Sequence, residues 1–285
     1  MPDTIEASCI FHEGERAAQR LAGEPTPQAL GIRRFMPDQH RDFFALLPYV
    51  PIAARDDAGW PVPTMLAGLP GFIASPDAMS LRIATMADPS DPVRPLLRAG
   101  AAFGLLGIDF STRRRNRANG RVVAADEQAL TLAVEQSFGN CPQYINLRDA
   151  TWHGAGRPST TQRFVGLDDQ ARALIGRADT FFVASGSADG LDISHRGGPP
   201  GFVRIEGATL VVPDYRGNRF FNTLGNLVLD PRASLLFVDF ERGDTLIVRG
   251  RVEIDWGSER AWRLKVEDGW RRPGALPLRW RERAA

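Results

Sequence analysis

The sequence predicts a mainly β chain with flanking helices (α+β), built as two tandem small barrels of six strands each. Three observations predict this fold. Blocks of sequence recur at a nearly constant spacing, short apolar runs are separated by Gly, Pro and Asp, and helical periodicity is confined to a few segments. The composition, 43% hydrophobic and 24% charged over 285 residues, is typical of a globular chain long enough for two domains.

The recurring blocks indicate how the chain is organised. Three pairs of segments are separated by 130 positions: Gly68–Ile73 and Gly198–Val203, Leu105–Phe110 and Leu235–Phe240, and Gly120–Val122 and Gly250–Val252. Gly, Pro and Asp positions agree as well as apolar ones, so a duplicated module explains the pattern better than the general likeness of short strands. We expect an N-terminal head (1–35), a first, degenerate barrel repeat (36–125), a helical connector (126–165) and a second barrel with a C-terminal helical tail (166–285).

Each repeat is expected to open with a helix that has an Asp near its start, at Asp38 to Leu47 and at Asp168 to Arg177. Six short runs rich in Val, Ile, Leu and Phe then predict the strands of the second repeat: Thr180 to Ser185, Leu191 to His195, Gly201 to Ile205, Thr209 to Val212, Ala233 to Phe240 and Thr245 to Ile254. Apolar spacing predicts helices over 217–229, over 126–138 in the connector and over 257–266 in the tail.

Charge and cysteine content exclude several classes of function. The net charge is +1, without the strongly basic domain of a duplex-binding protein, so we expect no nucleic-acid partner. Cys9 and Cys141 are too few for a disulfide framework or a Cys-rich zinc site, and the histidines lack metal-ligand spacing, so we expect no metal. The start has no signal-peptide pattern, and the uncharged stretch 59–76 is broken by Pro and Gly. We expect a cytoplasmic protein without a membrane span.

A polar cluster distinguishes the second repeat from the first. It comprises Ser194–Gly198, Arg204, Asp214–Arg219, Asn222, Thr223 and Asn226, whereas the first repeat has Pro63–Ala67 and Ala74 at the matching places. The guanidinium of Arg196 can form a bidentate hydrogen bond to a phosphate. The adjacent Gly197 and Gly198 let backbone N–H groups approach an anion closely. Asn222 and Thr223 begin a helix, whose N-terminus favours anions. The cluster therefore predicts a site for a phosphorylated, planar ligand; taken alone, His195 and Arg196 also fit a surface strand end.

The run DISHRGGPPGFVRI and the following NTLGNL resemble the pyridoxamine 5′-phosphate oxidase-like family of FMN-binding split-barrel flavoproteins, in its SHRGG/NTLGNL branch. The resemblance implies two tandem six-stranded split β-barrels of the FMN-binding type, with FMN as cofactor and Arg196 on its phosphate. Asn222 and Thr223 stand where the family has an Arg-Lys pair, so flavin binding is implied and the pyridoxamine phosphate reaction is not. The cofactor-binding residues that follow from the cluster and the resemblance are Ser194, His195, Arg196, Gly197, Arg204, Asp214, Tyr215, Asn218, Asn222, Thr223, Asn226 and Thr245.

The resemblance implies an oxidoreductase that moves electrons between a reduced nicotinamide or protein donor and a small acceptor. A non-catalytic flavin-binding or sensing module and a deazaflavin-dependent reductase are the alternatives. No catalytic residue is assigned, and the substrate, the donor and the acceptor stay open. The family usually binds FMN between two barrels, so the chain is either an intrachain pseudo-dimer of its two repeats or part of a homodimer.

Three further features of the sequence lie outside the polar cluster. Arg279 and Trp280, near the end of the chain, are weak candidates for a substrate pocket, because in the wider family such residues reach the substrate side. The run Arg113–Arg117 favours a solvated hairpin, and the alternative is that it faces the flavin or substrate phosphate of the other barrel. Cys141 has no nearby basic residue in sequence and is expected to be a packing residue.

Overall fold

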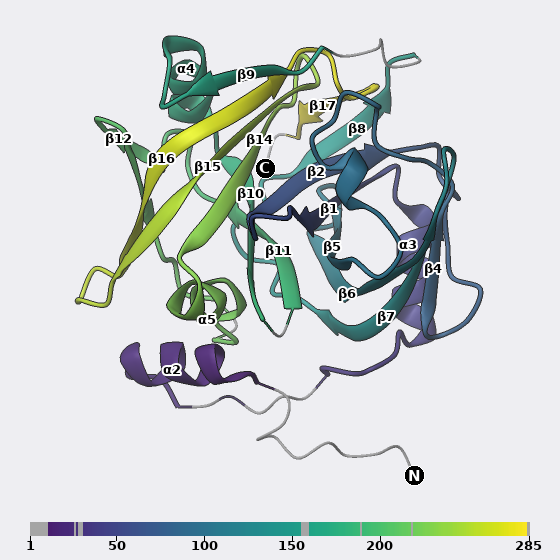
Figure 1. Ribbon diagram of the computed structural model, residues 1–285, viewed down its shortest axis with the longest axis horizontal. Helices are drawn as coiled ribbons and strands as arrows, with labels where there is room; N and C mark the ends of the chain where they lie inside the picture. The colour runs from purple at the N-terminus through teal and green to yellow at the C-terminus, as the bar shows by residue number, and fades with distance from the viewer. Residues whose placement is uncertain are drawn as a thin grey trace.

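The computed structural model describes residues 11–25, 27, 31–154, 160–188, 190–217 and 219–283. Across these ranges the chain forms two large antiparallel sheets, a two-stranded ribbon and a few short helices (Figure 1). The prediction of a mainly β chain with few helices is therefore confirmed.

The first sheet has the strand order β2-β1-β5-β6-β7-β4-β3. Its strands are β1 (Tyr49–Arg55), β2 (Pro61–Ala67), β3 (Ile73–Ala74), β4 (Ser80–Ile83), β5 (Ala102–Asp109), β6 (Arg114–Ala125) and β7 (Leu130–Gly139). Helix α3 (Asp38–Leu46) precedes the sheet, and a short 3₁₀ helix, η1 (Arg94–Leu96), lies between β4 and β5.

The second sheet has the order β11-β10-β14-β15-β16-β13-β12, which repeats the order of the first strand for strand, and β9 pairs with β16. Its strands are β9 (Gln162–Val165), β10 (Thr180–Ser187), β11 (Gly190–Gly197), β12 (Arg204–Glu206), β13 (Thr209–Pro213), β14 (Arg232–Asp239), β15 (Asp244–Asp255) and β16 (Ala261–Arg272). Helix α4 (Asp169–Arg177) is capped by Asp168, whose carboxylate accepts the N–H of Ala171, and α5 (Asn222–Leu229) lies between β13 and β14. A separate ribbon pairs β8 (Arg148–Trp152) with β17 (Leu278–Glu282).

Two predicted helices are wrong, and they fail at equivalent places. The connector helix expected over 126–138 is strand β7, which pairs with β6 and β4, and the tail helix expected over 257–266 falls on strand β16, which pairs with β15 and β13. Burial in β7 alternates residue by residue from Leu130 to Val134, and β16 does the same from Trp262 to Val266. Alternation with a period of two is the strand pattern, and each segment completes its sheet as the neighbour of a long strand.

Three hydrophobic cores explain why the central strands are buried on both faces. Successive residues of one strand point in opposite directions. Phe181 belongs to the core of the second sheet and Phe182 to a core shared by both sheets; Leu105 and Leu106 divide in the same way from the first sheet. A Cβ added to Gly104 on β5 would lie 2.7 Å from the carbonyl oxygen of Leu191 on β11, so the two sheets touch backbone to backbone.

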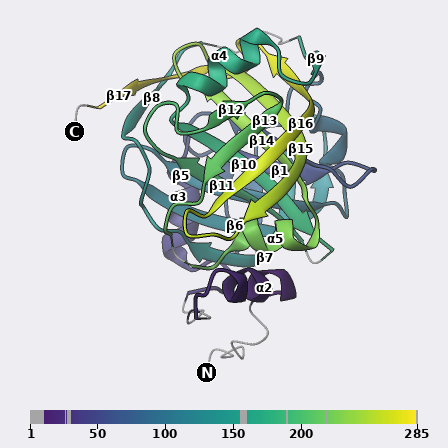
Figure 2. The same ribbon diagram turned by 90° about the vertical axis from the view of Figure 1, so that its left-hand side faces the viewer.

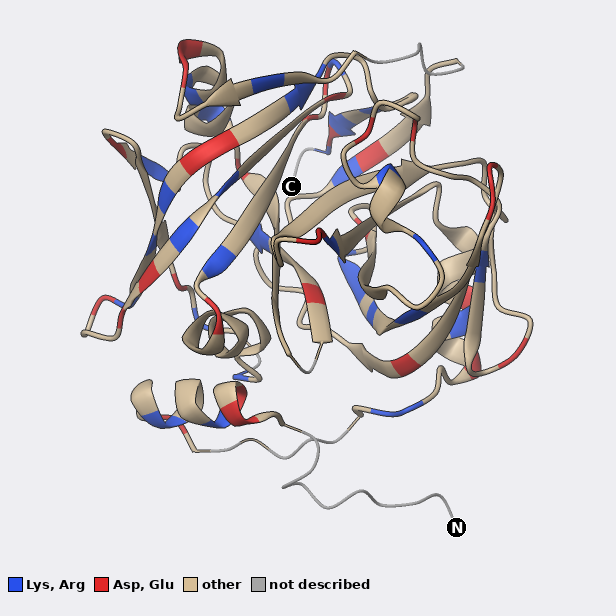
Figure 3. Cartoon of the chain, viewed as in Figure 1, with Lys and Arg blue, Asp and Glu red and all other residues tan. Residues whose placement is uncertain are grey.

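Helix α2 (Glu13–Leu21) ties the N-terminal head to the second sheet. It lies against α5 in both views (Figures 1 and 2). A Cβ added to Gly14 would lie 2.2 Å from the carbonyl oxygen of Gly225, so glycine permits this close helix crossing. In the view of Figure 3, basic and acidic positions are both spread over the two sheets. Within the described residues, none of the helices is long and apolar enough to cross a membrane.

Candidate functional site

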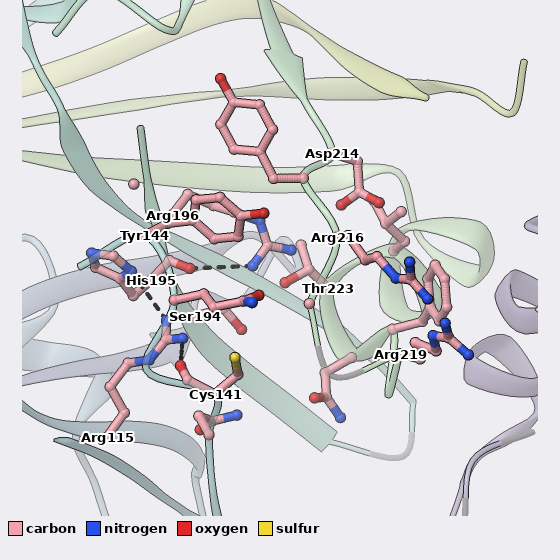
Figure 4. A pocket seen from close by; sticks show the side chains of 18 of the residues that line it. Arg115, Cys141, Tyr144, Ser194, His195, Arg196, Asp214, Arg216, Arg219 and Thr223 are labelled. Carbon is pink, nitrogen blue, oxygen red and sulfur yellow. Dashed lines mark hydrogen bonds between the residues drawn. The ribbon is translucent and has the colours of Figure 1, made fainter. Parts of the chain in front are cut away.

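A pocket lies between the two sheets, where β11 and α5 face β6 and the segment that follows β7 (Figure 4). Eight of the residues predicted for the cofactor line it: Ser194, His195, Arg196, Gly197, Asp214, Tyr215, Asn222 and Thr223. They come from β11, from the segment after β13 and from the first turn of α5. The fold therefore brings most of the predicted cluster into one cavity.

Three predicted residues lie elsewhere. Arg204 is exposed on the short strand β12 and pairs with Glu206 at 3.6 Å. Asn226 is buried on α5, where its amide donates to the carboxylate of Asp192 at 2.8 Å. Thr245 is buried on β15 and does not line the pocket. The structure therefore does not bring these three residues together with those that line the pocket.

The two substrate candidates also lie outside this pocket, on β17. Arg279 donates to the carbonyl oxygens of Leu276 and Leu278 at 2.9 and 2.7 Å, and Trp280 is buried in the shared core. Both line a separate groove. Asn218 lies outside the described residues.

Arg117 of β6 reaches from the first sheet into the second. Only 2% of this residue is exposed, so the solvated hairpin favoured for its segment does not describe it. Its guanidinium pairs with Asp192 at 2.6 Å and donates to the Ser194 hydroxyl at 2.5 Å. The ion pair compensates the charge of Arg117, and the second bond fixes the Ser194 hydroxyl at the pocket wall.

Arg115, two residues earlier on the same face of β6, has no such partner. Its guanidinium contacts His195 Nδ1 at 3.1 Å and donates to the carbonyl oxygen of Cys141, and no carboxylate in the described residues pairs with it (Figure 4). Burial lowers the pKa of Arg115 to about 10, and the charge of Arg196 adds to the effect. A buried guanidinium without a carboxylate is costly, so this charge favours an anion in the pocket.

Arg196 on β11 supplies a second guanidinium of the same kind. It donates to the carbonyl oxygen of His195 at 3.2 Å, while its Nε is buried and has no hydrogen-bond partner in the described chain. Burial lowers its pKa, and Asp214 acts in the opposite direction. Asp214 is itself paired with Arg260 at 2.6 Å. Arg115 and Arg196 therefore give the pocket positive charge that favours an anionic ligand.

His195 is neutral in this setting. It is 3% exposed, and burial followed by the charges of Arg115 and Arg196 holds its pKa well below the usual range. Because Arg115 donates to Nδ1, the ring proton is assigned to Nε2, which is buried and has no partner in the described residues. The ring is thus a neutral hydrogen-bond donor and not a cation.

The N-terminus of α5 forms another wall. Phe221 precedes the helix with φ 60° and provides no side-chain cap, and the Thr223 hydroxyl is buried without a partner in the described part of the chain. The amide of Asn222 donates instead to Glu15 of α2 at 2.5 Å. Burial, followed by the charge of Asp192, raises the pKa of Glu15 to about 8. Uncapped N–H groups at a helix start favour an anion.

Aromatic side chains form the rim of the pocket. The rings of Tyr144 and Tyr215 stack with centroids 5.1 Å apart and an angle of 22° between their planes, and Tyr215 also stacks on Phe202 at 6.3 Å. Tyr144 and Tyr215 are 43% and 39% exposed, so both present ring surface to solvent. Cys141 lies half-buried in the pocket wall next to Arg115 (Figure 4). Such a rim suits a flat ring.

Several lining residues were not predicted as ligands. Arg216 and Arg219 belong to the polar cluster of the second repeat but were not among the predicted ligands, and Tyr144 and Arg260 lie outside that cluster. Arg115 and Arg117 belong to a run for which contact with the other barrel was the second interpretation. The signal that favours this interpretation is their spacing of two residues, which places both on one face of a strand.

Comparison with known proteins finds similarity in the part of the chain that contains the second sheet. In the solved structures, similarity is found to a FAD-binding protein from Mesorhizobium loti (11% identity, 40% of this chain, 98% of that chain, TM-score 0.31). Similarity is also found to a putative pyridoxamine 5′-phosphate oxidase from Lactobacillus delbrueckii (15% identity, 37% of this chain, 95% of that chain, TM-score 0.29). HupZ from Group A Streptococcus is similar as well (18% identity, 35% of this chain, 90% of that chain, TM-score 0.29). No curated protein matches the chain. The family model described as pyridoxamine 5′-phosphate oxidase matches residues 167–276, which span α4 to β16.

Proposed function

We propose that the chain is a flavoprotein that binds FMN in the pocket between its two sheets and acts as an oxidoreductase. One observation carries the proposal. Arg115 and Arg196 place two guanidinium groups in one pocket without a carboxylate partner in the described residues. An anionic phosphate compensates both charges. The family match over 167–276 supports a flavin nucleotide as the molecule that carries the phosphate.

The residues present fit such a ligand. Arg115, Arg196 and the uncapped start of α5 would hold the phosphate, and the buried Thr223 hydroxyl would gain a partner there. The stacked rings of Tyr144 and Tyr215 offer a flat apolar surface to the isoalloxazine ring. Bound FMN would supply the electron-transfer chemistry, and the chain would orient it, exclude water and compensate its charge.

We further propose that the chain is two tandem split barrels that form an intrachain pseudo-dimer. The identical strand order of the two sheets supports a duplication. The pocket draws β11 from the second sheet and Arg115 from the first, which favours a site made within one chain over one made by a homodimer. Gly197 supports this close assembly, because a Cβ there would lie 1.9 Å from the carbonyl oxygen of Tyr144.

Flavin binding without turnover is the second candidate, and the acid–base groups of the pocket favour it. The two carboxylates that line the pocket are both paired, Asp214 with Arg260 and Glu24 with Arg219 at 3.1 Å. His195 is a weak base, because its pKa lies well below the usual range and its Nδ1 already accepts from Arg115. The lining therefore offers no free general base among the described residues, so any turnover would depend on the flavin and its electron donor.

The test is a titration of FMN into the purified chain, followed by quenching of flavin fluorescence. Arg196→Ala is expected to weaken binding by about 1.5–3 kcal/mol, roughly 10- to 150-fold. Arg204→Ala is the matched control, because Arg204 is exposed and lies outside the pocket. Equal affinities for both variants, or no binding by the unaltered chain, would contradict the site.

Two further measurements separate the candidate functions. Mass spectrometry of the ligand released from the purified protein distinguishes FMN from a deazaflavin. Addition of NADH or NADPH to the flavin-loaded protein tests turnover: bleaching of the flavin absorbance supports the oxidoreductase, and absence of bleaching with every donor supports the binding module.

A further inference from the structure

The matching strand registers define which residues of the two sheets are equivalent. Thr64 on β2 lies opposite Ile52, and Ser194 on β11 lies opposite Val183. Ile52 and Val183 each pair in turn with the first leucine of the repeated Leu-Leu dipeptide on the next strand. Thr64, and not Pro63 as the sequence comparison predicts, therefore occupies in the first sheet the position that Ser194 occupies in the second, at the pocket wall.

The opposite side of the pocket has an equivalent as well. Asn140 follows β7, donates its backbone N–H to the carbonyl oxygen of Arg115 and lines the pocket. Arg272 ends β16 opposite Thr245, which is the residue of β15 that corresponds to Arg115. Arg272 in the second sheet is therefore equivalent to Asn140 in the first sheet. Its side chain points toward the first sheet, where it contacts Asp91. The two sheets thus define a second location related to the pocket by the duplication.

A carboxylate of the chain fills this second location. Asp91, which is 2% exposed, lies between β4 and β5 just before η1, as the start of α5 lies between β13 and β14. Its Oδ2 accepts from the Thr64 hydroxyl and from Arg272 Nη1, each at 2.6 Å, and its Oδ1 accepts the backbone N–H of Val93 at 2.9 Å. Thr64 and Arg272 are buried too, so the carboxylate is enclosed by a hydroxyl, a guanidinium and a backbone N–H.

The pocket also offers a hydroxyl, a guanidinium and a helix start, and the two carboxylates that line it, Asp214 and Glu24, are paired with Arg260 and Arg219. The Ser194 hydroxyl takes the place of that of Thr64. The guanidinium of Arg196 supplies the charge that Arg272 supplies to Asp91, but it comes from β11 and not from the position equivalent to Arg272, which Asn140 holds; the first turn of α5 lacks a side-chain cap. We infer that the Asp91 carboxylate is a built-in substitute for the anionic group of the ligand, so that the chain keeps one ligand site and closes its duplicate. This inference rests on the proposed function for the identity of the ligand, and it assigns one anion per chain to the pocket.

The test removes the internal carboxylate and supplies one from solution. Asp91→Ala removes the nearer carboxylate of buried Arg272, which keeps only the contact with Asp88 at 3.4 Å, and is expected to lower the melting temperature by roughly 10 °C. Sodium formate, whose carboxylate fits the vacated space, is expected to restore most of that loss, whereas sodium chloride at equal ionic strength is not. If the variant does not fold without an additive, the amount of soluble protein obtained in sodium formate is compared with the amount obtained in sodium chloride.

Asp268→Ala is the matched control. Asp268 is also a buried carboxylate bonded to arginines, Arg249 and Arg163, but it lies on β16 outside both locations. A formate effect in Asp91→Ala that exceeds the effect in Asp268→Ala, with one equivalent of FMN bound by the unaltered chain, supports the inference. Equal formate effects, no formate effect, or two equivalents of FMN would overturn it. Because the formate experiment contains no flavin, a chain that fails to bind FMN contradicts the proposed function alone.

Discussion

Replacing Arg115 by methionine is expected to weaken ligand binding and to stabilise the unliganded protein. Arg115 contacts His195 and Cys141 but no carboxylate in the described chain, so its charge stays uncompensated until an anion enters. Methionine keeps the length and the apolar stem of the side chain and removes only the charge. Loss of a charge-assisted contact to phosphate is expected to cost about 1.5–3 kcal/mol of affinity.

The gain in stability follows from the pKa of Arg115, which burial lowers from its ordinary value to about 10. This shift corresponds to at most about 3 kcal/mol of destabilisation of the charged form. The lost hydrogen bonds offset part of it, so we expect a net gain of about 1 kcal/mol and a melting temperature higher by roughly 2–4 °C. Differential scanning fluorimetry without ligand and a fluorescence titration of FMN measure the two effects.

Arg117→Met provides the opposite case on the same strand. Arg117 is paired with Asp192, so its removal leaves a buried carboxylate unpaired and is expected to cost about 3–5 kcal/mol of stability. A melting temperature that falls equally in both variants would refute the distinction between a compensated and an uncompensated arginine. Unchanged FMN affinity in Arg115→Met would remove the first sheet from the proposed site.

Three other predictions concern stability. The pKa of Glu15 is raised to about 8, so the folded chain holds this proton more tightly than the unfolded chain, and the free energy of unfolding falls as pH rises from about 4.5 to 8; urea titrations of Glu15→Gln over this range should give a flatter profile, and an unchanged slope would contradict the assignment. The pKa of His40 is lowered to about 4 by burial, so stability falls as pH drops from about 6.5 to 4; His40→Gln should lose less stability on acidification, as followed by circular dichroism. Gly104→Ala is expected to cost about 1–3 kcal/mol, because its Cβ would lie 2.7 Å from the carbonyl oxygen of Leu191; an unchanged melting temperature would mean that the two sheets are not packed this closely.

The elements that could be predicted are those in which a local signal and the final pairing agree. Asp168 predicts the start of α4, and it caps that helix. The six runs of the second repeat correspond to β10 through β15, with ends that move by a few residues. The segments of β7 and β16 carry apolar residues that fit both a helical face and an alternating strand. Only the neighbouring strand decides between them, and that information lies elsewhere in the sequence.

The site divides in the same way. Ser194, His195 and Arg196 are consecutive on one strand, so their association could be predicted from one short motif. Asn222 and Asn226 have the right chemistry for a ligand, but their amides bond to Glu15 and Asp192. Those partners come from other elements, and no local pattern reveals which polar groups the fold has already satisfied.

The core that both sheets share has a consequence for synthesis on the ribosome. Strands β1 and β5 are translated well before β10 and β14, yet the apolar face that contains Ala53 and Leu106 is covered only when the later strands arrive. The nascent first sheet therefore exposes a hydrophobic face until the second half of the chain has emerged from the ribosome. A pause in translation between the halves prolongs that exposure, and chaperones that bind apolar strands have their substrate there.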